Sequence, residues 1–220
     1  MVDVAELPHE LQELIWTEYR DGLHTRRADY VLRTVILDHI RTLCQSDDDF
    51  NRVLNWMAHM LQYPNIKPQR GIALVGPSRC GKTLFVNLVT LLLGQNNVSR
   101  STTLRNRFNN FLEGTTLVIL DGCNFSEEIA QINRLVFNRT ITIRRGYHDA
   151  IVVQAFHRVL VTANLLSPLL YHSIPFQQRF IVIPCGTVNG QEFYEAMHDP
   201  IKMSHFRQYL LERHVDANGL

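Results

Sequence analysis

Hydrophobic residues occur in two kinds of pattern along the chain. Between short apolar runs, apolar residues recur every three or four positions, as on the buried face of an amphipathic helix. The runs themselves are almost continuously apolar, which is typical of strands buried on both faces of a parallel sheet. These runs cover residues 71–75, 115–121, 158–163 and 180–183. The alternation of buried strands with helices predicts an α/β fold with a central, mainly parallel sheet.

Helical patterns also precede and follow this alternating region. Near the N-terminus, one helical segment begins at Pro8 and ends near Gly22, a second begins at Asp29, and a third begins at Ser46. Later helices are predicted over residues 82–93, 104–112, 127–138, 190–197 and 202–214, and a short strand near Val98. We therefore expect a small N-terminal helical bundle over residues 1–69, a P-loop core over residues 70–188 and a C-terminal helical element over residues 189–220.

The first apolar run leads into a loop with glycines at its two ends, and a helical pattern follows directly. A loop wrapped around phosphates must turn tightly and point backbone N–H groups inward, which glycine permits. Lys82 would then reach the β- and γ-phosphates, and the Thr83 hydroxyl would bind Mg²⁺. This strand, loop and helix predict a nucleoside triphosphate site formed by Gly76, Pro77, Ser78, Arg79, Cys80, Gly81, Lys82, Thr83 and Leu84.

Two later strands end in polar side chains. The run at 115–121 ends in Asp121, and the run at 158–163 is followed by Asn164. Ligands of α/β proteins bind at the carboxyl edge of the sheet, where both side chains would emerge. Asp121 is placed to hold Mg²⁺ through water, and Asn164 is placed to orient a water molecule beside the γ-phosphate. An acid that only caps the next turn is the alternative for Asp121.

Two β-branched segments flank a short polar stretch between residues 140 and 153 and predict a β-hairpin. Its tip carries Arg144, Arg145, Tyr147 and His148. Arginine side chains pair with phosphates and aromatic rings stack on bases, so such a tip suits single-stranded nucleic acid. On local grounds alone, a solvated turn accounts for the same residues equally well.

The composition of the chain does not by itself indicate a partner. The chain has 220 residues, of which 45% are hydrophobic, with 22 Lys+Arg against 21 Asp+Glu. A near-neutral protein needs a local basic patch to bind nucleic acid. The four cysteines are scattered and indicate neither a disulfide framework nor a zinc site. Without a recognisable leader or membrane-spanning run, we expect a protein with no membrane partner, in the cytoplasm of a host cell or in the nucleus of a eukaryotic host.

The order of these motifs resembles that of superfamily 3 helicases of the AAA+ type, specifically the helicase domain joined to primases in viruses, phages and plasmids. The resemblance covers about residues 51–183. It implies that Lys82, Asp121, Asn164 and Arg179 are catalytic, with Arg179 as an arginine finger that reaches a neighbouring subunit's ATP. It also implies Mg²⁺, a hexameric ring, single-stranded DNA in contact with the hairpin tip, and a separate primase or replication initiator as a partner.

One departure from the family pattern concerns hydrolysis. The family usually pairs the acid that corresponds to Asp121 with a second carboxylate, whereas here Gly122 and Cys123 follow. Glu127 and Glu128 are the nearest substitutes. The resemblance thus implies an ATP-dependent DNA helicase or translocase, and the missing acid leaves open a nucleotide-gated, oligomeric DNA-binding assembly protein with weak or no hydrolysis. A small-molecule P-loop kinase also suits the length of the chain, but it gives the basic hairpin no role.

Overall fold

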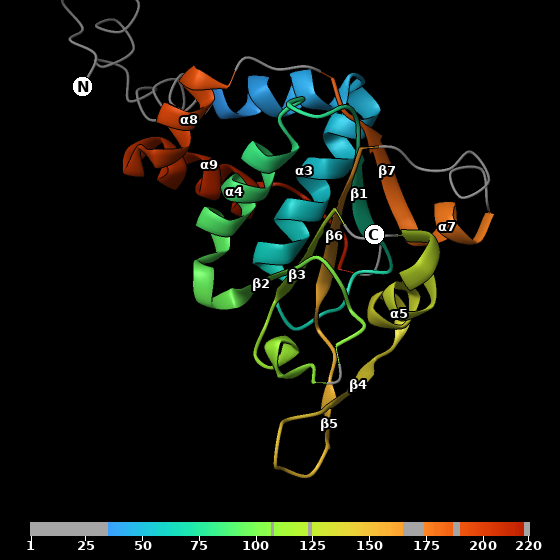
Figure 1. The fold of residues 1–220 in the computed structure, drawn as a ribbon. Helices are drawn as coiled ribbons and strands as arrows, with labels where there is room; N and C mark the ends of the chain where they lie inside the picture. Colours follow the sequence, from blue (N-terminus) through green and yellow to red (C-terminus); the bar gives the residue numbers. More distant parts are fainter. Residues whose placement is uncertain (1–34, 107, 123–124, 165–173, 187–189, 218–220) are drawn as a thin grey trace, which may run out of the picture.

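Five parallel strands form the central sheet of the computed structural model, in the order β2-β3-β6-β1-β7 (Figure 1). Their bounds are Gly71–Val75 (β1), Val98–Ser101 (β2), Leu117–Asp121 (β3), Arg158–Ala163 (β6) and Phe180–Pro184 (β7). The structure describes residues 35–106, 108–122, 125–164, 174–186 and 190–217. The predicted helix from Pro8 to Gly22 and the start of the next one lie outside these residues. The predicted α/β fold with a parallel sheet is confirmed, with helices before and after it.

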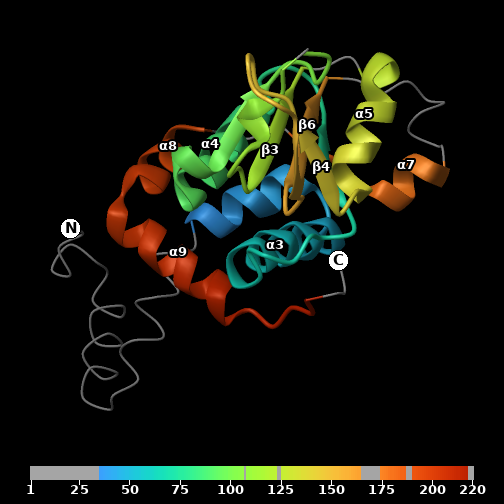
Figure 2. The ribbon, with the colours of Figure 1, turned by 90° about the horizontal axis from the view of Figure 1, so that it is seen from below.

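Helices pack on both faces of this sheet (Figure 2). A helix over residues 35–44 is followed by α3, which begins after the N-cap Ser46, whose hydroxyl accepts a hydrogen bond from the Asp49 amide. Gly94 ends α4, as its left-handed φ of 83° permits. The bounds are Asp47–Gln62 (α3), Lys82–Leu93 (α4), Phe125–Phe137 (α5), Ile174–Arg179 (α7), Gln191–His198 (α8) and Pro200–Glu212 (α9).

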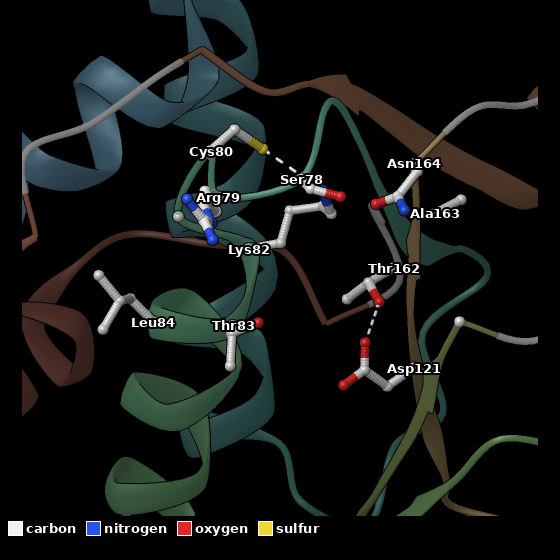
Figure 3. A pocket seen from close by; sticks show the side chains of 12 residues that line it. Ser78, Arg79, Cys80, Lys82, Thr83, Leu84, Asp121, Thr162, Ala163 and Asn164 are labelled. Carbon is white, nitrogen blue, oxygen red and sulfur yellow. Dashed lines mark hydrogen bonds between the residues drawn. The ribbon is translucent and has the colours of Figure 1, made fainter.

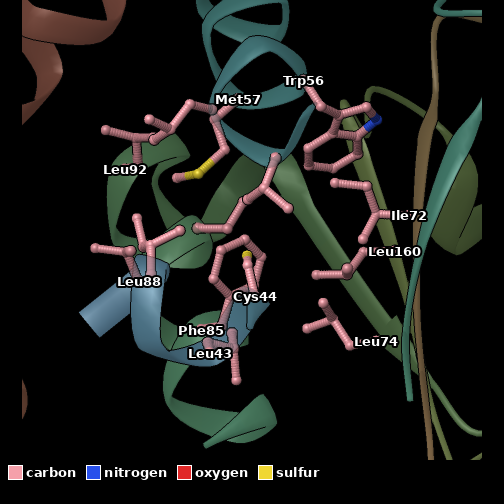
Figure 4. Close-up of a cluster of buried hydrophobic side chains, with 14 of the residues drawn as sticks. Leu43, Cys44, Trp56, Met57, Ile72, Leu74, Phe85, Leu88, Leu92 and Leu160 are labelled. Atoms are coloured by element: carbon pink, nitrogen blue, oxygen red, sulfur yellow. The ribbon is translucent and has the colours of Figure 1, made fainter. Parts of the chain in front are cut away.

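The hydrophobic core has two parts, one on each face of the sheet. Side chains of a strand point alternately to its two faces, so Ile72 and Leu74 pack on one side while Ala73 packs on the other. The larger part lies between the sheet and α3, α4, α8 and α9, and Figure 4 shows Trp56, Phe85 and Leu160 within it. The smaller part lies against α5 and α7. Because both faces are covered, β1, β3, β6 and β7 read as mostly continuous apolar runs.

The helix predicted over residues 104–112 is wrong. Only Asn110–Leu112 form a single 3₁₀ turn, called η3, within the described part of this segment. The Asn109 amide, which in this helix would donate to the Arg105 carbonyl oxygen, donates instead to the Arg144 carbonyl oxygen at 3.2 Å. The Leu112 amide donates to the Asn109 carbonyl oxygen at 3.0 Å, which is the i to i−3 bond of a 3₁₀ turn. The apolar spacing alone therefore overstated the helix.

The helices of the described chain do not include one that is long and apolar enough to cross a lipid bilayer.

His39 makes folding stability depend on pH. Its ring stacks on that of Phe193, with centroids 3.6 Å apart, and burial lowers its pKa from 6.5 to about 4. Between these values the unfolded chain binds a proton that the native chain excludes, so stability is complete above about pH 6.5 and falls as the pH drops towards 4. We expect acidification from about pH 7.5 to about pH 5 to remove about 2 kcal/mol through His39 alone.

Urea unfolding of the wild type and of His39→Phe at both pH values measures this contribution. Phenylalanine keeps a ring against Phe193 but cannot titrate, so the variant should lose about 2 kcal/mol less than the wild type on acidification. An equal loss in both proteins would show that His39 does not carry the effect.

Candidate functional site

A pocket of about 610 Å³ lies at the carboxyl edge of the sheet, between the loop that follows β1 and the ends of β3 and β6. In Figure 3, Lys82 and Thr83 lie on one side of it, and Asp121 and Asn164 lie on the facing side. The residues that line it are Ser78, Arg79, Cys80, Gly81, Lys82, Thr83, Leu84, Asp121, Gly122, Thr162, Ala163 and Asn164. Three segments that are distant in sequence thus meet at one place.

The backbone of the loop after β1 has the tight turn for which glycine was predicted. Gly81 has a φ of 98° and precedes the first residue of α4 without a side-chain cap, so the first amides of this helix are available to a ligand. Gly76 and Pro77 are not among the residues that line the pocket, and Gly76 instead packs behind the loop. A Cβ at Gly76 would lie 2.9 Å from the Cys185 carbonyl oxygen, which leaves no room for any other residue.

Lys82 is buried inside the loop. Its ammonium donates hydrogen bonds to the carbonyl oxygens of Gly76 at 2.7 Å and Pro77 at 2.8 Å, and to Cys80 Sγ at 3.4 Å. An ammonium group has three N–H donors, so these contacts use all of them. The loop therefore holds a single positive charge against its own carbonyl groups, and a phosphate would have to replace some of these contacts.

Both carboxylate oxygens of Asp121 are engaged. Oδ1 accepts a hydrogen bond from the Thr162 hydroxyl, and Oδ2 forms an ion pair with the Arg100 guanidinium. Burial raises the pKa of Asp121, but the hydrogen bonds from Thr162 and Arg100 and the positive charges of Arg100 and Lys82 lower it, and the net shift is downward. Asp121 is therefore ionised at neutral pH. A carboxylate and the Thr83 hydroxyl supply the hard oxygen ligands that Mg²⁺ prefers, so this pocket fits that ion.

Sequence reasoning missed Arg100 and Thr162 as partners of Asp121. Arg100 lies on β2, and its register partner on β3 is Ile119, two residues before the aspartate. Thr162 is the direct register partner of Asp121 on β6. The motif Thr162-Ala163-Asn164 was a signal for the second residue. No signal in the sequence pointed to the first, because β2 is short and mostly polar.

The two glutamates that were considered as a second acid point elsewhere. Arg105 Nη1 donates to Glu127 Oε2 at 2.9 Å, and the Glu128 side chain accepts the hydrogen bond from the Leu104 amide. Neither glutamate lines the pocket, where Asp121 is the one carboxylate among the described lining residues. The described lining residues therefore suit a phosphate and a cation, and they include no second carboxylate to activate water.

The predicted hairpin is formed by β4 (Thr140–Ile143) and β5 (Ile151–Gln154), which pair antiparallel and project beyond the central sheet (Figure 1). At its tip, Tyr147 is fully exposed and has a φ of 61°. Arg145 forms an ion pair with Glu113 from the loop around η3. These residues are remote from the pocket: none of Arg144, Arg145, Tyr147 and His148 lines it.

The loop before η3 supports this tip. Asn109 accepts a hydrogen bond from the Arg144 amide at 2.6 Å and donates one to the Thr142 carbonyl oxygen at 2.9 Å. The Phe108 ring lies beside Gly146, where an added Cβ would be 3.8 Å from it. Phe108 therefore joins the hairpin surface, and the predicted helix over this segment concealed that role.

Arg179 ends α7 and lies outside the pocket. Its guanidinium is 4.9 Å from the ring centroid of the half-exposed Phe137 at the end of α5. The structure thus brings together Lys82, Thr83, Asp121 and Asn164, and leaves Arg179 and the hairpin tip at two other places on the chain.

Comparisons with known proteins agree with this fold. A family model described as "Family of unknown function (DUF5906)" matches residues 74–173. Among solved structures, the apo structure of the NrS-1 C-terminal region (305-718) is 17% identical, with a TM-score of 0.68 over 84% of this chain and 47% of that chain. The A form of the same region is 18% identical, with a TM-score of 0.70 over 84% of this chain and 46% of that chain.

Similarity at this level of identity establishes a shared fold, and the chain spans less than half the length of these structures. A JCV helicase bound to a small molecule is 16% identical with a TM-score of 0.43, over 92% of this chain and 66% of that chain, which is too weak to support an inference. No curated protein matches the chain.

Proposed function

We propose that the chain is an ATP-dependent helicase or translocase that moves along single-stranded DNA during replication of a viral, phage or plasmid-like replicon. The observation that carries this proposal is the meeting of the P-loop, Asp121 and Asn164 in one pocket. The motifs occur in an order that resembles superfamily 3 helicases. From this resemblance we take the substrate, single-stranded DNA, and the location, the cytoplasm or nucleus of a host cell.

Each part of the pocket has a role in this proposal. The amides at the start of α4 and the Lys82 ammonium bind the phosphates, with the helix dipole favouring their negative charge. Thr83 and Asp121 hold Mg²⁺, which neutralises charge on the phosphates when bound. The Asn164 amide orients the attacking water. The cations among the described residues that line the pocket are Arg79 and Lys82, both from the loop after β1. We assign the positive charge on the facing side to Arg179 of a neighbouring subunit in a hexameric ring.

Substitution of Lys82 tests the nucleotide site. Lys82→Ala is expected to weaken binding of a fluorescent ATP analogue roughly 10- to 100-fold, because a hydrogen-bonded charge on the phosphates is lost. Lys202→Ala removes the same charge from α9, away from the pocket, and should bind like the wild type. Circular dichroism confirms that both variants fold. A folded wild type that does not bind the analogue would overturn the proposal.

A nucleotide-gated assembly protein is the second candidate. The engagement of Glu127 by Arg105 and of Glu128 by the Leu104 amide favours it, since neither is available as a second acid. Such a protein would bind ATP and oligomerise without turnover. An ATPase assay with and without single-stranded DNA separates the candidates: DNA-stimulated turnover supports the helicase, and binding without turnover supports the assembly protein.

A further inference from the structure

A second pocket, of about 430 Å³, lies at the opposite edge of the sheet from the P-loop. It is lined by Asn65, Ile66, Lys67, Gln69, Arg139, Gln154, Ala155, Phe156 and Ala217. Gln69 precedes β1 and Phe156 precedes β6, so the amino ends of these strands form one wall. We infer that this pocket binds one nucleotide unit of a single-stranded nucleic acid, with a backbone phosphate against Arg139 and Lys67 and a base stacked on Phe156.

The charge of the pocket is suited to a phosphate. Two of the residues that line it are cationic and none is acidic. Lys67 is held in place by two hydrogen bonds, to the carbonyl oxygens of Leu135 at 2.7 Å and Asn138 at 2.9 Å. Its third N–H donor is not used by these bonds. The Arg139 side chain is exposed and makes no hydrogen bond or ion pair with the described residues.

Hydrogen bonds from one buried side chain connect two walls of the pocket. The buried guanidinium of Arg158 donates to the carbonyl oxygens of Ile66 and Phe156, both at 2.9 Å, and thereby fixes two segments that line the pocket. Burial, together with the charge of Arg158, lowers the pKa of Lys67 to about 8, so Lys67 is still mostly charged at pH 7. A further anion would relieve the repulsion between these cations.

The pocket also offers an aromatic side chain on which the base of a nucleotide can stack. Phe156 is 38% exposed and lines the pocket, and so do the amide residues Asn65 and Gln154. Binding of single strands combines such aromatic platforms with cations along the backbone. A base stacked on the Phe156 ring would bury part of its aromatic surface, and the two amide side chains would face the edge of the base.

The position of the pocket favours a strand over a free nucleotide. Arg139 and Gln154 stand at the base of the hairpin, where the Ala155 amide bonds to the Arg139 carbonyl oxygen at 2.8 Å. From there β4 spans roughly 13 Å, and the tip with Tyr147 follows it. A single strand of several nucleotides is long enough to contact both places, and two linked contacts raise its affinity. This inference rests on the DNA-binding part of the proposed function and extends it.

Binding of a fluorescent oligothymidylate of about 20 nucleotides, measured by anisotropy at several salt concentrations, tests the two contacts separately. Arg139→Ala should lower affinity roughly fivefold at 0.1 M salt and reduce the salt slope by about 0.7, the value for one phosphate. Arg134→Ala removes the same charge from an exposed position on α5 and should change neither. Phe156→Leu should lower affinity at least about fivefold with the slope unchanged, because only stacking is lost.

Cross-linking gives a readout that a general loss of stability would not produce. An oligonucleotide with 5-iododeoxyuridine should form an adduct at Phe156 on irradiation, located by mass spectrometry of the peptides. Adducts confined to the hairpin tip, or Arg139→Ala and Phe156→Leu variants that bind like Arg134→Ala, would overturn the inference.

Two comparisons separate the possible failures. If Tyr147→Ala weakens binding and the pocket variants do not, the inference about the pocket is overturned and the proposed function stands. If the wild type does not bind the oligonucleotide, the DNA-binding part of both proposals is overturned. Equilibrium dialysis with deoxythymidine monophosphate covers the remaining case. If the monophosphate binds as tightly as the oligonucleotide, and Arg139→Ala abolishes this binding, the pocket binds a free nucleotide. That result would overturn the inference that it binds a single strand.

Discussion

Arg179→Ala is expected to lower DNA-stimulated ATP hydrolysis by about 1,000-fold or more while ATP affinity stays close to that of the wild type. An arginine that stabilises the charge on the transferring phosphoryl group contributes this much to the rate and little to ground-state binding. Within one chain, Arg179 lies against Phe137, outside the pocket that Lys82 and Asp121 line. The proposed function therefore requires that Arg179 acts on the nucleotide of a neighbouring subunit. Single-turnover hydrolysis and anisotropy with an ATP analogue measure the two quantities.

Mixing two inactive variants gives the sharper test. Arg179→Ala keeps an intact pocket and Lys82→Ala keeps an intact arginine, so rings formed from both contain some interfaces with a complete site. Hydrolysis should be partly restored in the mixture, whereas an arginine acting on its own chain would give no restoration. Arg134→Ala serves as the charge control and should remain fully active alone. Equal loss of ATP binding and hydrolysis in Arg179→Ala would contradict the assigned role.

The parts of the site that could be predicted are those fixed by short sequence segments. The P-loop needs glycine at defined positions and a lysine at the start of a helix, so residues 76–83 indicate the structure by themselves. Asp121 and Asn164 were placed correctly at one edge because strands buried on both faces are apolar throughout and the first polar residue after each marks its end. Their meeting in one pocket follows from the parallel direction of the strands.

The parts that could not be predicted depend on contacts between distant segments. Arg100 reaches Asp121 because β2 pairs with β3, and nothing near Arg100 indicates this partner. Arg145 lies at the tip of the hairpin, but its ion pair with Glu113 could not be predicted from the residues around it. The same ion pair belongs to the loop around η3, where a helical spacing of apolar residues was misleading. Periodicity reports which residues can be buried, and not which tertiary contacts replace the helical hydrogen bonds.

Arg158 shows the same limit most clearly. In sequence it is a charged residue at the start of an apolar strand, a position that suggests an exposed end. In the structure it is buried, and its guanidinium donates to the carbonyl oxygens of Tyr63, Pro64, Ile66 and Phe156. These acceptors lie in the connection from α3 to β1 and in the turn before β6. Arg158 therefore joins the helical segment before the P-loop to the sheet.

Arg158→Met should lower the free energy of unfolding by about 3–5 kcal/mol, because the buried carbonyl groups lose their donors while the side-chain volume is largely kept. Burial lowers the pKa of Arg158 to about 10, so the wild-type group stays charged at neutral pH and its hydrogen bonds are charge-assisted. Equilibrium unfolding in urea at neutral pH measures the loss.

Two further variants keep this prediction testable even if Arg158→Met does not fold. Arg158→Lys retains the charge and some of the hydrogen bonds, so its loss of stability should be smaller but clear. Arg70→Met removes a guanidinium from an exposed position one residue before β1 and should alter stability by no more than about 0.5 kcal/mol. If Arg158→Met and Arg70→Met were equally stable, the bonds of Arg158 would not hold the connection from α3 to the sheet, and water would have to satisfy those carbonyl groups.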